Sequence, residues 1–237
     1  MATKNLEQRI QHLEEINDKQ QRKMEDQQLK IERLEAAREI ENMMSRYEYY
    51  HVNNRHKEVM AMYSKDAGTR VYFGELGYWK GANAPQRAWG LLDQMPPQPG
   101  TMHFHPTMCP VIEVAADGKT AQAVWTTFGF ESGVKKDTGE LDPQYAWGTY
   151  GADLIKEDGQ WKFWHFHIYR LLMHPVNKPW TTKEGWDPDK EGGMELPDDK
   201  KPDAPGIDDS PYRTDKVNVI KPDPPLPYKT WGDTKMS

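Results

Sequence analysis

Residues 161–170 constrain the fold most, because large rings occur on both faces of one extended segment. The stretch reads Trp-Lys-Phe-Trp-His-Phe-His-Ile-Tyr-Arg and follows a polar, glycine-bearing run at 157–160 that predicts a hairpin turn. Alternation along a strand would place five side chains on one face: Trp161, Phe163, His165, His167 and Tyr169. We therefore predict a strand covered on both sides, whose two imidazoles line a pocket or, alternatively, belong to the core.

Further strands are predicted by apolar runs that end at turn residues. The runs are 69–73, 101–114, 120–132 and 145–154, and glycines bracket a short aromatic hairpin around Tyr78. Helical periodicity is confined to the first part of the chain. Helices followed by long antiparallel strands predict an α+β fold, a curved antiparallel sheet whose concave face is closed by helices.

The first 38 residues carry a heptad pattern. The spacing between successive seam residues alternates between four and three positions. These residues are Leu6, Ile10, Leu13, Asn17, Gln20, Met24, Gln27, Ile31 and Leu34. Asn17, Gln20 and Gln27 weaken this seam in its middle. We predict a coiled-coil helix over residues 1–38 that makes the protein a homo-oligomer, a trimer or a dimer; a lone solvated helix is the alternative.

The segment after residue 38 shows a broad apolar face at helical spacing, which predicts two helices separated by Asn53-Asn54-Arg55. Asn83 followed by Pro85 predicts the start of another helix, which ends before the proline-rich break at 96–100. We assign residues 39–172 to one catalytic domain.

Residues 173–237 hold eleven of the eighteen prolines, together with several tryptophans and tyrosines. Disordered segments are usually poor in such rings, so we predict an extended arm, stiffened by proline, that crosses its own domain or a neighbouring subunit. The acidic centre of the arm, 187–209, is expected to be disordered.

Composition excludes several classes of protein. The net charge is −6 and there is no basic block, so nucleic acid is not an expected partner. The single cysteine, Cys109, excludes an intrachain disulfide framework and a cysteine-based zinc site. No apolar run approaches the length of a membrane span, and we expect a cytoplasmic protein that does not bind membranes.

The middle of the chain resembles the SnoaL-like branch of the NTF2-like superfamily, which includes scytalone dehydratase and bile-acid 7α-dehydratase. The resemblance rests on the order and spacing of several motifs: the helix at 40–47, the helix end at 61–67, His105 seven residues before Ile112, the turn at 117–121, and the run 157–163. The C-terminal run 224–231 resembles tails in a subgroup that includes formaldehyde-releasing lyases of lignin-derived diarylpropanes.

The resemblance implies a cone-shaped α+β barrel with a deep apolar pocket and elimination chemistry without a cofactor. It places His105 at the position of the family's acid/base histidine, whereas the family's aspartate falls near Val52 or Asn53, so that Glu131, Asp153 or a histidine pair would have to substitute. The predicted catalytic residues are His105, His167, Tyr50, His51 and Arg70. The predicted substrate-binding residues are Tyr47, Tyr72, Tyr78, Trp79, Lys80, His103, Trp125, Glu131, Tyr150 and His165.

The predicted function is therefore a cofactor-independent lyase that removes water or formaldehyde from a small apolar aromatic or polycyclic substrate, with histidines as acid and base. A metal-dependent enzyme that uses both His-x-His pairs, 103–105 and 165–167, is one alternative. A non-catalytic binding module is another. Arg70 and Lys80 could equally form surface ion pairs.

Overall fold

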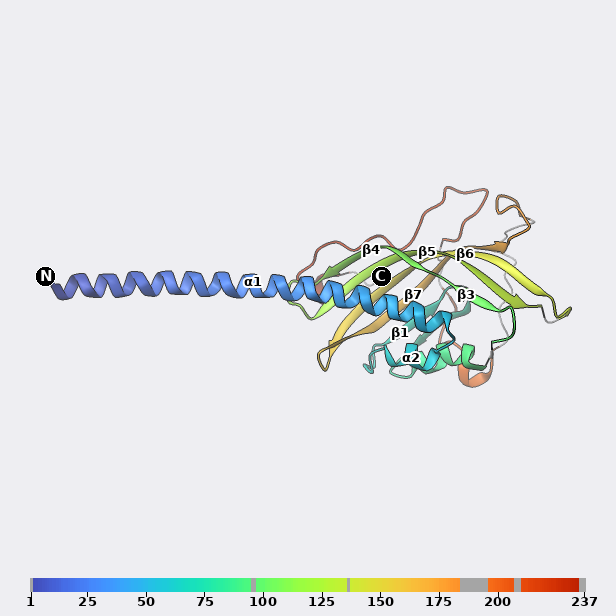
Figure 1. Cartoon of the computed structure of the whole chain (residues 1–237), viewed down its shortest axis with the longest axis horizontal. Helices are drawn as coiled ribbons and strands as arrows, with labels where there is room; N and C mark the ends of the chain where they lie inside the picture. The colour runs from blue at the N-terminus through green and yellow to red at the C-terminus, as the bar shows by residue number, and fades with distance from the viewer. Residues whose placement is uncertain (1, 95–96, 136, 184–195, 207–209, 235–237) are drawn as a thin grey trace.

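A computed structural model of the chain describes residues 2–94, 97–135, 137–183, 196–206 and 210–234. A long helix, α1 (Ala2–Val52), projects from a domain in which helices cover one face of a sheet (Figure 1). The sequence up to Val52 contains neither glycine nor proline, so nothing in it interrupts helical hydrogen bonding. The predicted boundary at residues 38 and 39 thus lies inside one continuous helix.

Burial along α1 begins where the helix reaches the domain. The guanidinium of Arg33 donates hydrogen bonds of 2.8 and 3.1 Å to the carbonyl of Val114. From Ala36 onward, one stripe of α1 is buried, including Ile40, Met44 and Tyr47. The second helix, α2 (His56–Ala61), follows the predicted break at 53–55, and α3 (Ala84–Ala88) continues into a 3-10 helix at Trp89–Gln94.

The sheet has seven strands among the described residues: β1 (Arg70–Phe73), β2 (Gly77–Lys80), β3 (Met102–Phe104), β4 (Thr107–Val114), β5 (Thr120–Val134), β6 (Leu141–Glu157) and β7 (Gln160–Pro175). Their order is β2-β1-β7-β6-β5-β3, with β4 also paired to β5. All pairs are antiparallel except β1 with β7. The sheet is therefore mixed rather than wholly antiparallel, because β1 enters from the helices and runs beside the last strand.

The inner face of the sheet, which packs against the helices, carries an aromatic core. Tyr47 of α1 lies at ring-centroid distances of 5.1 Å from Phe166, 5.8 Å from Tyr150 and 6.0 Å from Phe163. Trp89 meets the same tyrosine at 5.6 Å. Burying such large rings stabilises the packing between helices and sheet.

A bulge in β7 changes the face of the residues that follow it, as far as a second register shift at Leu171. Asp153 pairs with His165, but the next residue of β6, Leu154, pairs with Phe163, so Trp164 is the extra residue. Phe163 and Phe166 consequently both face the inner core. The predicted common face for Trp161, Phe163, His165, His167 and Tyr169 was wrong, because simple alternation ignores this bulge.

The chain between β3 and β4 bends onto the inner face at Gly129 of β5. A Cβ built on Gly129 would lie 1.9 Å from the carbonyl oxygen of Phe104 and 3.1 Å from Cα of His105. Only glycine permits this approach. His105 is thereby directed into the interior beside α1.

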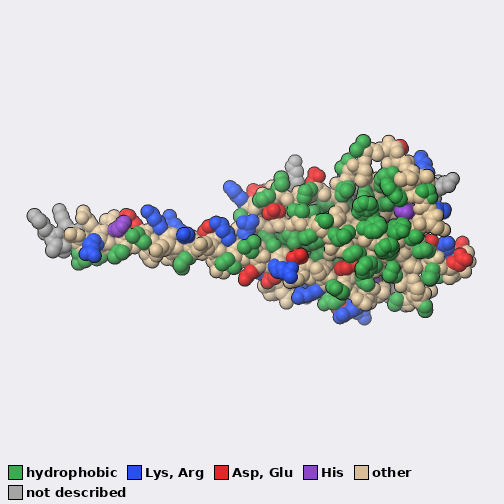
Figure 2. Space-filling view, turned by 45° about the horizontal axis from the view of Figure 1, so that its top comes forward, with side chains coloured by type: hydrophobic (Ala, Val, Ile, Leu, Met, Phe, Trp, Pro, Cys, Tyr) green, Lys and Arg blue, Asp and Glu red, His purple; other side chains and the backbone are tan. Residues whose placement is uncertain are grey.

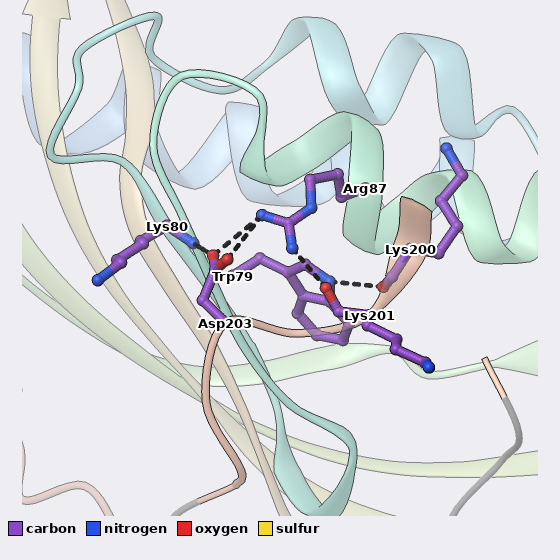
Figure 3. A network of polar contacts seen from close by, with 6 residues as sticks. All are labelled: Trp79, Lys80, Arg87, Lys200, Lys201 and Asp203. Carbon is purple, nitrogen blue, oxygen red and sulfur yellow. Dashed lines mark hydrogen bonds and ion pairs between the residues drawn. The ribbon is translucent and has the colours of Figure 1, made fainter. Parts of the chain in front are cut away.

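The C-terminal arm packs on its own domain. On the outer face of the sheet, the Thr149 hydroxyl donates to the carbonyl of Lys221, and the Trp231 and Trp164 ring centroids lie 4.9 Å apart. Near β2, a latch joins the arm to α3 (Figure 3). There the Asp203 carboxylate accepts hydrogen bonds from the Lys80 backbone (2.8 Å) and the Arg87 guanidinium (3.0 Å).

The predicted disorder of 187–209 does not hold for 196–206, because this part of the arm forms the latch; the rest of that segment lies outside the described residues. The indole Nε1 of Trp79 donates a 2.8 Å hydrogen bond to the carbonyl of Lys200, which adds a buried anchor (Figure 3). Within the described ranges, no helix combines the length and apolar character needed to cross a membrane.

Candidate active site

The candidate site is built around His105 and Glu131, which meet on the inner face where β3 ends beside β5. Nε2 of His105 lies 3.0 Å from Oε1 of Glu131. His103 approaches the same carboxylate, with Nδ1 3.9 Å from Oε2. As predicted, His103 and His105 lie on one side of their segment. Both imidazoles approach the Glu131 carboxylate.

Glu48 of α1 closes the site from the helical side. Its Oε1 accepts a 2.8 Å hydrogen bond from the backbone N–H of His105. Its Oε2 is buried and has no hydrogen-bond partner among the described residues. Burial raises the pKa of Glu48 to about 7, against the lowering effects of the His105 backbone and charge. Glu48 can therefore hold or release a proton near neutral pH.

The pKa of Glu131 is shifted in the opposite direction from that of Glu48. Burial alone would raise its pKa, but the hydrogen bond and charge of His105, with the charges of Arg170 and His103, outweigh that effect and lower the pKa to about 2. Glu131 is consequently ionised at physiological pH. An ionised carboxylate beside His105 stabilises the imidazolium that forms when this histidine takes up a proton.

His51 of α1 lies close to the imidazole rings of His103 and His105. Its ring centroid is 5.8 Å from that of His105 and 6.0 Å from that of His103. Burial, together with the charges of the neighbouring histidines, lowers the pKa of His51 well below its usual value, so this ring remains neutral. Its buried Nδ1 has no hydrogen-bond partner within the described part of the chain.

Two buried tyrosines form the inner wall of the site. Burial raises the pKa of both Tyr47 and Tyr150 well above the ordinary phenol value. Both therefore keep their protons and can act as hydrogen-bond donors, but not as bases. Tyr47 stacks on His51 at 5.8 Å, which fixes both side chains.

A hollow of about 150 Å³ opens beside Glu131. It is lined by His103, Glu131, Gly133, Val134, Lys135, Asp142, Gln144 and Met173. A space of this size accommodates about one aromatic ring. The hollow gives a small molecule access to the carboxylate that His105 and His103 share.

The structure places the other histidine pair on the opposite side of the sheet. The β1–β7 register sets Tyr72 beside His167, with ring centroids 4.8 Å apart, and Tyr169 stacks on His167 at 3.6 Å. His165 Nδ1 lies 2.8 Å from Asp153 Oδ2. His105 and His167 are therefore not brought together, and a sheet separates the two residues predicted as acid and base.

The remaining predicted residues fall into two groups. Strand register places four on the outer face with His167: Arg70, Tyr72, Tyr78 and Lys80. On the inner side, Trp79 and Trp125 are buried in the core. Tyr50 is partly buried on α1, where the Arg55 guanidinium lies 4.7 Å from its ring centroid.

Two residues of the site were not predicted from the sequence. Glu48 could have been found, because it lies one helical turn from Met44 and three residues before His51 on the buried stripe of α1. Arg170, whose charge acts on Glu131, could not, because the bulge in β7 decides which face it occupies.

Metal-binding capacity is confined to one group among the described residues. One ligand atom each from His103, His105 and Glu131 lie within 4.8 Å of one another. Two imidazoles and one carboxylate form a donor set that suits zinc or iron. The predicted alternative with both His-x-His pairs on one metal does not fit, since the pairs lie on opposite faces.

Comparison with known proteins identifies the family. The cone of helices on a curved sheet is that of the NTF2-like superfamily. The chain belongs to the SnoaL-like domain family, whose model matches residues 32–167, more than half of the sequence. No curated protein sequence matches the chain.

Solved structures agree on the fold. A protein from Novosphingobium aromaticivorans, assigned provisionally as a scytalone dehydratase, is 19% identical, with a TM-score of 0.51 over 69% of this chain and 99% of its own. A type 2 hexachlorocyclohexane dehydrochlorinase is 14% identical, with a TM-score of 0.51 over 63% of this chain and 95% of its own. At these identities the likeness shows a common fold.

Proposed function

We propose that the chain is a cofactor-independent lyase that eliminates water or formaldehyde from a hydroxylated, largely apolar aromatic substrate such as a lignin-derived diarylpropane. The observation that carries the proposal is the His105–Glu131 pair at 3.0 Å, placed beside a buried Glu48 whose pKa is about 7. A base and an acid that both work near neutral pH are what an elimination requires. The family's solved relatives include proteins described as a dehydratase and a dehydrochlorinase, which supports this class of reaction.

In the proposed reaction, His105 takes a proton and ionised Glu131 stabilises the resulting imidazolium. For loss of water, the proton leaves carbon, the C–O bond breaks, and the departing hydroxyl receives a proton from Glu48. For loss of formaldehyde, the proton leaves the hydroxymethyl oxygen, the adjacent C–C bond breaks, and the electron pair forms a C=C bond as a neighbouring hydroxyl departs as water. Neutral His51 and the phenols of Tyr47 and Tyr150 orient the substrate.

The size of the hollow supports a ring-bearing substrate. About 150 Å³ holds roughly one ring, so one aryl group would occupy the hollow beside His103 and Glu131 while the reacting carbon points toward His105. On the α1 side of the site, the buried rings of Tyr47 and Tyr150 exclude water from Glu48, which strengthens the electrostatic interactions of this carboxyl group. The rest of a larger substrate would extend beyond the hollow.

The test is turnover of a panel of hydroxylated diarylpropanes and steroids by protein dialysed against a chelator. We expect formaldehyde release or a mass decrease equal to one water for at least one diarylpropane. A ligand that binds tightly but emerges unchanged would instead favour the non-catalytic binding module. Unchanged masses across the panel would overturn the proposed lyase.

A metal-dependent enzyme is the second candidate, favoured by the His103, His105 and Glu131 donors within 4.8 Å of one another. Its test is elemental analysis of the purified protein and of a His103→Ala variant. Stoichiometric zinc or iron that disappears in the variant would replace the cofactor-independent mechanism. Equal, substoichiometric metal in both proteins would exclude this candidate.

A further inference from the structure

We infer that the projecting part of α1 pairs with the same segment of another copy of this chain, in parallel and in register. The heptad seam from Leu6 to Leu34 is exposed to solvent in the single chain. Its large apolar members are well exposed, with 58% of Leu6, 63% of Leu13, 65% of Met24 and 73% of Leu34 accessible to solvent. Figure 2 shows apolar side chains along the helix beyond the domain, between basic and acidic ones.

A helix of this length is not stabilised by its own domain over most of its course. Residues 5–32 are all exposed, and isolated helices in water gain little beyond their backbone hydrogen bonds. A regular apolar seam on such a helix is the pattern that coiled-coil partners bury. Isoleucine at 10 and 31 with leucine at 6, 13 and 34 fits the alternating a and d positions of such a seam.

The seam points away from the domain, so a partner helix can reach it. Residues in an α-helix are spaced by about 100°, which sets Ile31 about 160° from Arg33 and Leu34 about 160° from Ala36. Arg33 and Ala36 are the residues where α1 first meets its own domain, Arg33 through its hydrogen bond to Val114 and Ala36 through burial. The sheet therefore lies on the far side of the helix from the seam.

Charges beside the seam favour a parallel copy of the same sequence. In a parallel pair, the position before each a residue faces the position after the following d residue of the partner. Arg9 would then face Glu14, and Lys30 would face Glu35, with no like-charged pair along the seam. In the antiparallel arrangement that overlaps the whole seam, Arg9 would face Lys30, which is repulsive.

Polar residues inside the seam support the same register. Asn17 occupies an a position, where one asparagine typically fixes register because it hydrogen-bonds to its counterpart in a parallel pair. A shift by one heptad would set Asn17 against Met24 or Ile10 and leave its amide without a partner. The in-register arrangement is therefore the one that satisfies both charge and polarity.

Disulfide trapping in the full-length chain tests this inference. In a background where exposed Cys109 is replaced by serine, Leu13→Cys should form a disulfide-linked dimer under mild oxidation, because Leu13 meets itself only in the parallel, in-register pair. Arg22→Cys, on the opposite side of the helix, should stay largely uncrosslinked. Adding Ile10→Asp and Ile31→Asp should reduce the Leu13→Cys crosslink at least tenfold, whereas Gln8→Asp and Gln11→Asp should leave it.

The antiparallel arrangement predicts a different result. There, Leu13 meets Met24, so Leu13→Cys alone would not crosslink, but a mixture of Leu13→Cys and Met24→Cys chains would give a mixed dimer. That outcome, or the absence of any crosslink at both positions, would overturn the inference. All the substituted side chains are exposed in the single chain, so the domain should fold in each variant.

Discussion

Nε2 of His105 lies 3.0 Å from Oε1 of Glu131, and the backbone N–H of the same histidine is held by Glu48 from the opposite side. One histidine is thus fixed between a carboxylate that is ionised and one whose pKa is about 7. Carboxylates whose environments move their pKa values apart commonly divide the work of acid and base. This relationship defines the candidate site and determines most of the predictions below.

Glu131→Gln should lower stability at neutral pH but not in strong acid. The pKa of Glu131 is lowered from 4.5 to about 2, so its contribution is fully present above pH 4.5 and is lost as pH falls through 2. The variant should lose up to about 3 kcal/mol at pH 7. Urea unfolding at pH 7 and at pH 2 measures this, with exposed Glu140→Gln as control; an equal loss at both pH values would contradict it.

Glu48→Gln should have the opposite dependence on pH. The pKa of Glu48 is raised from 4.5 to about 7, so the wild-type chain loses stability, relative to the variant, as pH rises from 4.5 through 7. We expect the variant to gain at most about 3 kcal/mol at pH 8 compared with pH 4.5. Unfolding of both proteins at the two pH values tests this, beside exposed Glu39→Gln. Parallel pH profiles for wild type and Glu48→Gln would show that burial does not raise this pKa.

Gly129→Ala should displace His105 without removing any polar group. A Cβ at Gly129 would collide with the backbone of Phe104, so the segment that carries His105 must shift. We expect turnover to fall by about 10²-fold, because small displacements of a catalytic group cost that much. The control is Gly232→Ala in the C-terminal arm, away from the hollow, where an added Cβ meets only the Thr230 hydroxyl at 3.9 Å. Full activity in Gly129→Ala would mean that the close approach does not position His105.

Asp203→Asn should loosen the arm from β2. The Asp203 carboxylate accepts hydrogen bonds from the Lys80 backbone and the Arg87 guanidinium. Loss of its charge should cost about 1 kcal/mol, since the pair is partly exposed. Amide hydrogen exchange at 200–204 should rise, whereas Asp198→Asn, whose carboxylate is almost fully exposed, should leave exchange unchanged. Unaltered protection in Asp203→Asn would contradict the role of this latch.

Sequence patterns were sufficient to predict most helices and strands and to place His103 and His105 on one side. Periodicity and turn residues predicted the helix break at 53–55, the long hairpin strands and the pairing of His103 with His105. They failed at Trp164, because a bulge depends on how the partner strand is paired and leaves no mark on local alternation. His165 and His167 were assigned to the wrong face for that reason.

Glu48 shows a second kind of limit. A glutamate in a long, charged helix is ordinarily solvent-exposed, and most of the acidic residues of α1 are. Its burial follows from tertiary packing, since only the last turns of α1 lie against the sheet. The apolar stripe that contains Met44 indicates the side of α1 on which Glu48 is buried, but the rise in its pKa depends on the strands packed against that side, and no window of the sequence contains those contacts.

The most direct test of the proposed function compares His105→Ala with His167→Ala on the first hydroxylated aromatic compound that the wild-type chain converts. Both histidines are buried and both sit among aromatic rings, but only His105 lies on the inner face beside Glu131. We predict that kcat falls about 10²-fold or more in His105→Ala and stays within about threefold of wild type in His167→Ala, which is far from the reacting atoms. A wild-type rate in His105→Ala, or an equal loss in both variants, would contradict the proposed site.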